Sequence, residues 1–273
     1  MSHIAKTSKM AIISLLLGNI FLYLPIMFIV INSFSASEIP GIWTSFSLKW
    51  FFAVFEDEDL LLAAFTSLKV AVISATGAVL LGVLTAMSTA KTQPFPTKRF
   101  LSNIILMPVF MPEIIVGFSL LMFFVFLEAV LGFPKERGIA TVIIGHITAT
   151  IAYVYIAVRA KLSTLDISLE EAAMNLGARP FIIFLKIKIP AIGKSILVGW
   201  LLAFTMSLDD LVIASFLTGP SSTTLPILIF SNVKIGATPA INAFATMFVL
   251  TIATCLFLAY LFSLPSKNQR VLK

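Results

Sequence analysis

Charged residues are scarce in this chain. Asp, Glu, Lys and Arg make up 12% of its 273 residues, whereas apolar residues make up 59%. A soluble globular domain carries roughly 25% charged and 45–50% apolar residues. A soluble fold of this size would have to expose much of the excess apolar surface. The composition therefore predicts an integral membrane protein and excludes a disordered or collagen-like chain.

Residues that build disulfides and metal clusters are almost absent. Cys255 is the single cysteine, and His3 and His146 are the two histidines. One cysteine cannot form an internal disulfide, and these three side chains do not make a metal-binding spacing. We expect neither a disulfide scaffold nor a resident metal or other cofactor in this chain.

A motif for ATP binding is also missing. Gly77 and Gly82 have the spacing of the glycines in G-x-x-x-x-G-K-[ST], but a valine follows Gly82 and the stretch is apolar throughout. The chain therefore has no P-loop. If its work requires ATP, a separate subunit must bind and hydrolyse the nucleotide with its Mg²⁺, and we do not expect this chain to be an enzyme.

The chain contains several long apolar stretches with few charged residues. About 20 apolar residues cross a bilayer as a helix, and we identify six stretches of this kind. They predict an all-α integral membrane protein with six transmembrane helices. The stretches are Met10–Ile31, Lys69–Thr89, Phe100–Phe126, Ile139–Val158, Ile196–Phe216 and Ala240–Phe262.

The positive charges predict the orientation of these spans. Cytoplasmic loops carry an excess of Lys and Arg. With the N-terminus inside, fourteen of the 19 Lys and Arg residues lie in inside segments and four in outside segments. We therefore expect both termini in the cytoplasm. The net charge of +6 is then explained by topology, and no nucleic-acid partner is needed.

The spans and loops also predict the organisation of the chain. Residues 1–65 hold the first span and an acidic outside loop, and residues 66–262 form the main transmembrane domain. Residues 263–273 are a cytoplasmic tail. A short interfacial helix is expected near Leu60–Ser67, before the second span. The inside loop at 159–195 is longer than a connection requires.

That inside loop contains the strongest motif. Glu171-Ala172-Ala173 is followed by Gly177 and, nine residues later, by Ile187-Lys188-Ile189-Pro190. The residues before Gly177 favour a helix, Gly177 can take the positive φ that ends it, and Pro190 is expected to break the next helix. The residue types alone fit either a helical hairpin that docks a partner or an amphipathic loop lying on lipid headgroups.

The spacing of the motif decides between these two interpretations. It resembles the EAA loop of binding-protein-dependent ABC importer permeases, E-A-A-x3-G-x9-I-x-L-P, with Ile189 in place of the leucine. The resemblance covers nearly the whole chain and is greatest to the polyamine branch, especially its putrescine permease subunits. The further stretches that carry it are Ser67–Ala71, Met111–Glu113, Gly199–Phe216, Thr218–Pro220, Thr224–Pro226 and Asn242–Ala243.

The resemblance implies a type I ABC importer fold, with the EAA loop as a coupling-helix hairpin on the inner face. It implies that the chain lies in the bacterial inner membrane and has four kinds of partner. These are a second homologous permease subunit, a dimer of ATP-binding subunits, a periplasmic polyamine-binding protein and the surrounding lipid. The expected transport cargo is putrescine or spermidine. The residues implied in coupling to the ATPase are Glu171, Ala172, Ala173, Gly177 and Pro190.

Three carboxylates lie within the predicted spans, where each costs about 2.5–3.5 kcal/mol at the bilayer centre. Glu113 and Asp209 both lie 13 residues from the inner ends of their spans, which places them at one level about 20 Å from the inner surface. A diamine is a dication at neutral pH, so its pathway needs anions. Because adjacent helical residues point about 100° apart, we expect one of Asp209 and Asp210 to face the pathway and the other to bond to backbone or a neighbouring helix. The structural alternative is that these carboxylates cap broken helices.

Aromatic residues could contribute to the same pathway. Trp200 and Phe204 are four residues apart and share a helix face, where their rings could contact an ammonium group. Packing within the membrane is the alternative for both. His146 is expected to hydrogen-bond between helices.

Three alternatives to a polyamine permease remain at this stage. The chain could be an importer permease for another small solute, or an ion-coupled secondary transporter using the three carboxylates, although such proteins often show two related halves that are not visible here. It could also be a membrane transferase in which paired aspartates hold Mg²⁺, but no third aspartate follows Asp210 on the same face.

Overall fold

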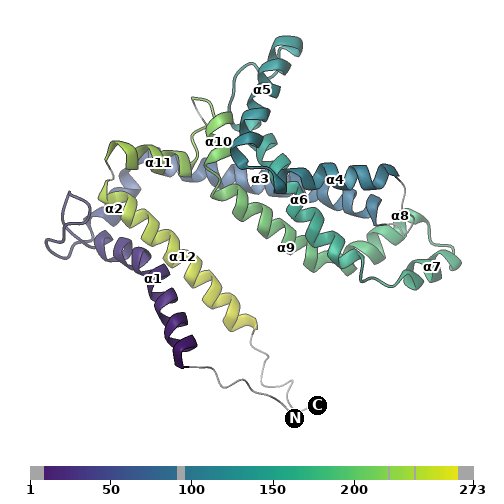
Figure 1. Cartoon of the computed structure of the whole chain (residues 1–273), viewed down its shortest axis with the longest axis horizontal. Helices are drawn as coiled ribbons and strands as arrows, with labels where there is room; N and C mark the ends of the chain where they lie inside the picture. Colours follow the sequence, from purple (N-terminus) through teal and green to yellow (C-terminus); the bar gives the residue numbers. More distant parts are fainter. Residues whose placement is uncertain (1–8, 91–95, 221, 237, 264–273) are drawn as a thin grey trace. The chain divides into compact units, whose positions relative to one another are not determined.

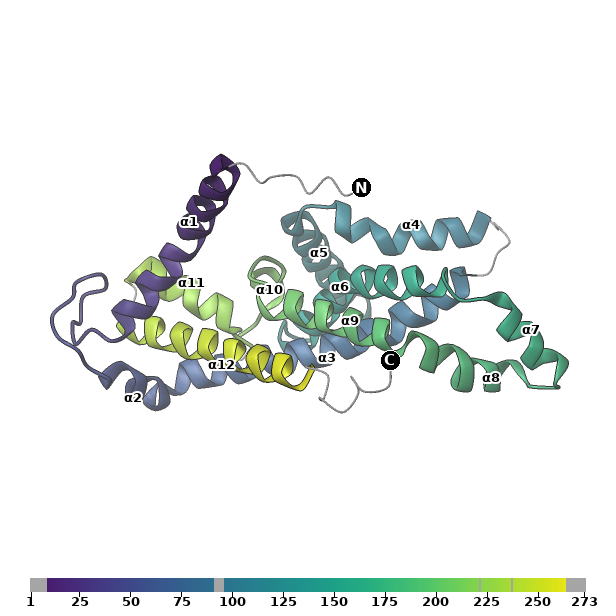
Figure 2. The ribbon, with the colours of Figure 1, turned by 90° about the horizontal axis from the view of Figure 1, so that it is seen from below.

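A computed structural model describes residues 9–90, 96–220, 222–236 and 238–263. These residues are helical apart from turns, loops and one isolated bridge between Ser35 and Phe46 (Figures 1 and 2). Within them, four helices are long and apolar enough to cross a membrane: Met10–Ser33, Glu58–Thr89, Glu113–Leu131 and Ile139–Leu162. The all-α, multi-helix membrane architecture predicted from the sequence is therefore confirmed at this level.

The chain divides into two compact units, and the first combines its two ends: residues 1–61 and 229–273. Helix α12 (Pro239–Ser263) packs against α1 (Lys9–Ser33) and α2 (Lys49–Glu56). Phe34, at the end of α1, has its ring 5.0 Å from that of Phe51 on α2.

The second unit comprises residues 62–228 and contains α6 (Ile139–Leu162) between α3 (Glu58–Thr89) and α9 (Ile189–Leu208). Val154 of α6 is fully buried between two glycines. A Cβ added to Gly82 of α3 would lie 2.9 Å from the Val154 side chain, and one added to Gly199 of α9 would lie 3.1 Å from its Cα. Small residues thus allow the three helices to approach closely, as is common between helices in membranes.

Two of the six predicted spans are not continuous helices. The stretch Phe100–Phe126 contains the end of α4 (Pro96–Phe110) and most of α5 (Glu113–Leu131). The break follows from Pro112, which has no N–H and disfavours a helical conformation at the residue before it. The stretch Ile196–Phe216 is likewise divided between α9, which ends at Leu208, and α10 (Val212–Leu217).

Pro190 does not break its helix, so that prediction is wrong. Helix α8 (Pro180–Ile183) runs through a π-helical turn at Phe184–Lys188 directly into α9. In the turn, the N–H of Ile189 bonds to the carbonyl of Phe184, five residues back. A proline in a regular helix clashes with the carbonyl four residues earlier, and the wider π turn places that carbonyl differently. Pro190 is accommodated at the second position of α9.

Other boundaries also differ from the sequence predictions. Leu60–Ser67 is not a separate helix, because α3 begins at Glu58 and continues to Thr89. The separate short helix before the second span is α2, and α11 (Leu225–Ile235) was not anticipated. Residues 264–273 of the predicted tail lie outside the described residues.

Candidate functional site: an exposed hairpin and a junction of broken helices

The loop after α6 contains a capped helix, α7 (Ile167–Asn175). Asp166 is its N-cap, and its Oδ1 accepts a hydrogen bond of 2.9 Å from the backbone N–H of Ser168. This bond satisfies one of the free amides of the first turn and holds the pKa of the exposed Asp166 carboxyl below its usual value.

Gly177 ends α7 as the sequence predicted. Its φ is +80°, a conformation that costs other residues energy because of their Cβ. The N–H of Gly177 bonds to the carbonyl of Met174 at 2.9 Å, and that of Ala178 bonds to the carbonyl of Ala173 at 3.0 Å. This pair of bonds is a Schellman motif. It reverses the chain so that α8 can follow after Arg179.

One ion pair ties the two parts of this hairpin together. Lys188 Nζ lies 2.7 Å from the carboxylate of Glu170, and both side chains are about a quarter exposed. The neighbouring Glu171 and Ala172 are exposed, and Leu176 is 88% exposed. Residues 166–190 therefore form a hairpin whose exposed surface carries charges of both signs and apolar side chains, which we call the hairpin surface.

The two helix breaks meet beside α6. Helix α10 packs against both α5 and α6, and α5 begins at Glu113, just after the first break. Together they enclose a cavity of about 40 Å³, which we call the junction cavity. It is lined by Pro108, Glu113, Val116, His146, Ala149, Thr150, Tyr153, Met206, Ser207, Asp210 and Ile213.

The two adjacent aspartates at the second break differ in environment. Asp210 lines the junction cavity, and its Oδ1 accepts a 3.0 Å hydrogen bond from the N–H of Ala214 in the first turn of α10. Asp209 is the residue that follows α9, and it is exposed. The sequence predicted that one aspartate faces the pathway and that the other bonds to backbone or a neighbouring helix. Asp210 does bond to backbone. Which carboxylate contacts a substrate stays a prediction.

Glu113 reaches the junction cavity from the other broken helix. It is the first residue of α5, where a carboxylate interacts favourably with the helix dipole. The sequence placed Glu113 and Asp209 at one level, and the structure brings Glu113 together with the neighbour Asp210. A cavity of this volume holds water molecules but is too small for an extended diamine.

His146 also lines the junction cavity, although the sequence predicted for it only a hydrogen bond between helices. Its Nδ1 lies 2.6 Å from Ser207 Oγ, which joins α6 to α9 as expected. Its Nε2 lies 3.9 Å from Asp210 Oδ1. The sequence did contain a signal for a further role of His146, since it is a lone histidine in an apolar span. Ionisable residues within a membrane span are energetically costly and usually functional.

Trp200 and Phe204 share a face, as their spacing predicted. Their rings are stacked with centroids 5.1 Å apart, and Trp200 Nε1 donates a 3.2 Å hydrogen bond to Thr76 Oγ1 of α3. The pair therefore joins α9 to α3. Neither residue lines the junction cavity, so their predicted contact with substrate is not supported by this arrangement and stays a prediction.

A second polar cluster lies at the end of α6 nearest the hairpin. The buried Tyr155 hydroxyl lies 2.6 Å from Ser102 Oγ of α4 and 3.2 Å from Thr89 Oγ1 of α3. Arg159 donates to Tyr155 at 2.9 Å and to Thr89 at 2.7 Å. These bonds connect three helices just before the chain enters the hairpin, and the sequence alone did not reveal them.

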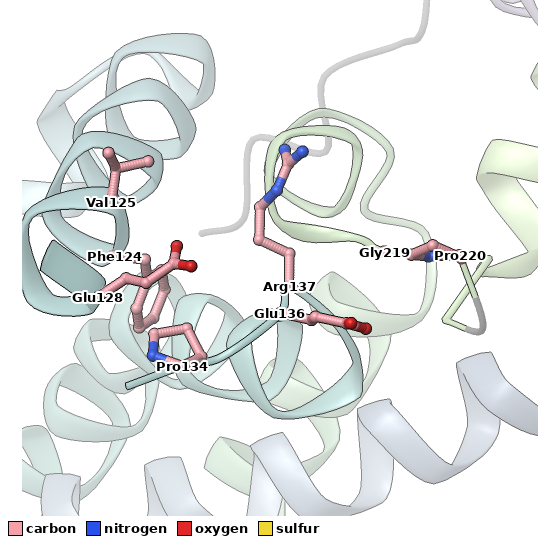
Figure 3. Close-up of a pocket in the computed structure, with 8 residues that line it drawn as sticks. All are labelled: Phe124, Val125, Glu128, Pro134, Glu136, Arg137, Gly219 and Pro220. Carbon is pink, nitrogen blue, oxygen red and sulfur yellow. The ribbon is translucent and has the colours of Figure 1, made fainter. Parts of the chain in front are cut away.

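The other end of α6 borders a larger pocket of about 340 Å³ (Figure 3). Arg137, just before α6, donates a 3.2 Å hydrogen bond to the carbonyl of Phe216. A Cβ at Gly219 would clash with the carbonyl oxygen of Arg137, so only glycine fits there. The lining residues are Phe124, Val125, Glu128, Pro134, Glu136, Arg137, Gly219 and Pro220.

The exposed hairpin and the apolar helices are both features of one known protein family. Residues 78–265 match the model of the binding-protein-dependent transport system inner membrane component. The chain belongs to this family. It is thus a multi-pass permease of the inner membrane and a transport subunit rather than an enzyme, as the EAA spacing predicted.

Curated relatives of this permease cover nearly its full length. It is 41% identical to the putrescine transport system permease protein PotI of Escherichia coli K12, over 97% of this chain and 94% of that protein. It is 38% identical to the spermidine/putrescine transport system permease protein PotC of the same strain, over 84% of each chain. The predicted resemblance to the polyamine branch is confirmed.

Solved structures support the permease fold. A bacterial ABC transporter involved in the import of alginate matches with a TM-score of 0.67 and 16% identity, over 96% of this chain and 98% of that chain. The MetNI methionine ABC transporter, in an inward-facing conformation, matches with a TM-score of 0.53 and 20% identity, over 75% of this chain and 92% of that chain. At these identities the similarity concerns the fold.

Proposed function

We propose that this permease imports a polyamine, with putrescine as its main substrate and spermidine as the second candidate. The observation that carries the proposal is the 41% identity to the putrescine permease PotI over 97% of the chain. The identity to PotC, whose name includes both polyamines, is lower at 38% and covers 84% of the chain.

The proposed topology places six crossings in the inner membrane, with both termini in the cytoplasm. Helices α1, α3, α6 and α12 each form one crossing, and the pairs α4–α5 and α9–α10 form the other two. Broken helices are tolerated in a membrane where they are buried in protein or line a water-filled cavity. The junction cavity between α5, α6 and α10 meets that requirement.

In this arrangement the hairpin surface is the docking site for the ATPase. Glu171, Ala172 and Ala173 lie on α7, Gly177 provides the turn, and Pro190 lies where the hairpin joins α9. Because α8 continues through the π turn into α9, a displacement of the hairpin is transmitted along α9 to Leu208, next to the two aspartates. ATP and Mg²⁺ belong to the partner subunit in this proposal.

The carboxylates at the junction supply the negative charge for a dicationic substrate. Glu113 and Asp210 border the cavity, and Asp209 is exposed beside it. A positively charged substrate in a low-dielectric pathway is stabilised by such charges much more strongly than in water. A second permease subunit and a periplasmic binding protein complete the proposed importer.

The test is uptake by the complete importer in proteoliposomes. This chain is combined with its ATPase, the second permease and the binding protein, and labelled putrescine and spermidine are offered separately. We expect ATP-dependent putrescine uptake that unlabelled putrescine abolishes. Transport of an unrelated solute in preference to both polyamines would overturn the substrate assignment.

The control distinguishes an importer from a secondary transporter. The chain is reconstituted alone, with a proton gradient and no ATPase. We expect no uptake under these conditions. Gradient-driven transport by the lone chain would contradict the proposed mechanism, whatever the substrate.

A further inference from the structure

We propose that His146 is a positioning residue that holds the Asp210 carboxylate through its Nε2–H across a water in the junction cavity. The inference deepens the proposed function, since it rests on Asp210 acting in the polyamine pathway. It concerns a side chain whose only role anticipated from the sequence is a bond between helices.

The first support is the unmatched nitrogen of His146. The side chain is 1% exposed, and within the described part of the chain its Nε2 is one of two buried polar side-chain atoms without a hydrogen-bond partner. Leaving a buried polar atom unpaired costs about 1–3 kcal/mol. A native structure retains such an atom where it has a partner in solution or in the working state.

The second support is the direction of that nitrogen. Nε2 faces Asp210 Oδ1 at 3.9 Å, which exceeds the usual length of a direct N–H···O hydrogen bond, about 2.7–3.2 Å. Polar atoms separated by more than about 3.5 Å are commonly bridged by a water. The cavity of about 40 Å³ that both residues line has the room that one water requires.

The groups around the imidazole favour a proton on Nε2. Nδ1 lies 2.6 Å from Ser207 Oγ, and a serine hydroxyl can donate to it. Nε2 faces a region bordered by two carboxylates, Asp210 and Glu113. A bare nitrogen lone pair turned toward these acids would be repelled, so in the proposed arrangement Ser207 donates to Nδ1 and the proton lies on Nε2.

This arrangement gives Asp210 two anchors. Its Oδ1 already accepts the N–H of Ala214 at the start of α10, and the imidazole approaches the same oxygen from α6. Asp210 is thereby held at the junction of α6, α9 and α10, with its charge on the cavity side. His146 itself does not contact the substrate.

Two substitutions separate this role from a purely structural one. In His146→Asn, the short amide can still reach Ser207 but not the cavity. In His146→Gln, the longer amide can place an N–H near the position of Nε2. We expect His146→Asn to lower the uptake rate about tenfold, the effect of one hydrogen bond to a charged group, and His146→Gln to retain most of the rate. If His146 serves only to join α6 to α9, the order of the two variants is reversed, and that result overturns the proposal.

A double-mutant cycle tests the partnership with Asp210. In an Asp210→Asn background, His146→Asn should have little further effect on uptake, because contacting residues are not additive. Independent, additive losses would contradict the proposal. Co-purification of the importer subunits with each variant serves as the control for assembly.

A spectroscopic measurement decides the inference without a transport assay. Because the chain has two histidines, the His3→Ala variant labelled with ¹⁵N-histidine and assembled with unlabelled partners reports on His146 alone. We expect protonated Nε2, unprotonated Nδ1, and an Nε2 signal that shifts in Asp210→Asn. A proton on Nδ1 overturns the inference. If the wild-type importer fails to take up putrescine but the predicted tautomer is found, the proposed substrate is wrong and the positioning role stands.

Discussion

The hairpin surface and the junction cavity are built in opposite ways. The hairpin is held by bonds between residues close in sequence, such as those from Gly177 and Ala178 to the last turn of α7, and Leu176 on it is 88% exposed. The junction is held by long-range contacts, with His146 joined to Ser207 and 1% exposed. An exposed, locally determined element suits docking, whereas a buried, multi-helix element suits a passage through the membrane.

The difference has a consequence for substitution. At the hairpin, a change of surface charge should alter partner binding and leave the fold intact. At the junction, a change of charge should alter transport itself, because Asp210 and His146 are largely removed from solvent, where charges interact strongly.

The largest effect is expected at the junction. Replacing both Asp209 and Asp210 by Asn removes two negative charges and should lower putrescine uptake on the order of 100-fold, equal to about 3 kcal/mol, the upper end for a hydrogen bond to a charged group. The measurement is ATP-dependent uptake in proteoliposomes, with subunit assembly checked in parallel. Normal transport by both single variants and the double variant would show that neither aspartate is a substrate site.

At the hairpin, Glu171→Lys should separate ATP hydrolysis from transport. The variant reverses a charge on the exposed docking surface, and like charges across an interface are strongly unfavourable. We expect about tenfold fewer substrate molecules moved per ATP hydrolysed, with membrane insertion unchanged. Glu171→Gln, which removes the charge without reversing it, is the matched control and should be milder. Full coupling in Glu171→Lys would count against the docking assignment.

Glu113→Gln should have a smaller effect than the double aspartate substitution. Glu113 is exposed at the start of α5, whereas Asp210 is mostly covered, so water screens its charge more strongly. A decrease in uptake of about threefold to tenfold is expected, equal to roughly 1 kcal/mol. A loss equal to or greater than that of the double variant would make Glu113 the principal site.

Gly177→Ala should weaken the hairpin modestly. The positive φ of +80° costs a residue with a Cβ about 1–2 kcal/mol, while Gly177→Asn should be better tolerated. Because the hairpin is local, we expect reduced coupling to ATP hydrolysis without loss of insertion. Coupling ratios for the two variants and the wild type provide the comparison, and equal ratios for Ala and Gly would contradict a strained turn.

The smallest effect is expected from Lys188→Met, which removes the ion pair with Glu170. Both partners are about a quarter exposed, and such pairs contribute about 0.2–1 kcal/mol. We expect a slight fall in the thermal stability of the assembled permease. Raising the salt concentration should reduce the difference between variant and wild type, and a salt-independent difference would assign the effect to packing.

Local chemistry explains which features could be predicted from the sequence. Gly177 ends α7 as expected, because the glycine and the helix it terminates are neighbours. Pro190 was misjudged because a single proline indicates a break, whereas the π turn at Phe184–Lys188 avoids the clash. The break at Pro112 could have been inferred by the same rule. The break after Leu208 has no proline, and just after it the Asp210 carboxylate accepts the N–H of Ala214 in the first turn of α10.

Apolar length, charge distribution and the spacing of Glu171, Gly177 and Pro190 are properties of the linear order, and they are enough to identify a helical membrane protein and a binding-protein-dependent permease. That His146, Glu113 and Asp210 line one cavity follows from the tertiary packing alone. These residues come from three separate parts of the chain. Their meeting depends on how closely α5, α6, α9 and α10 pack, which in turn depends on side-chain volumes at contacts that no local pattern records.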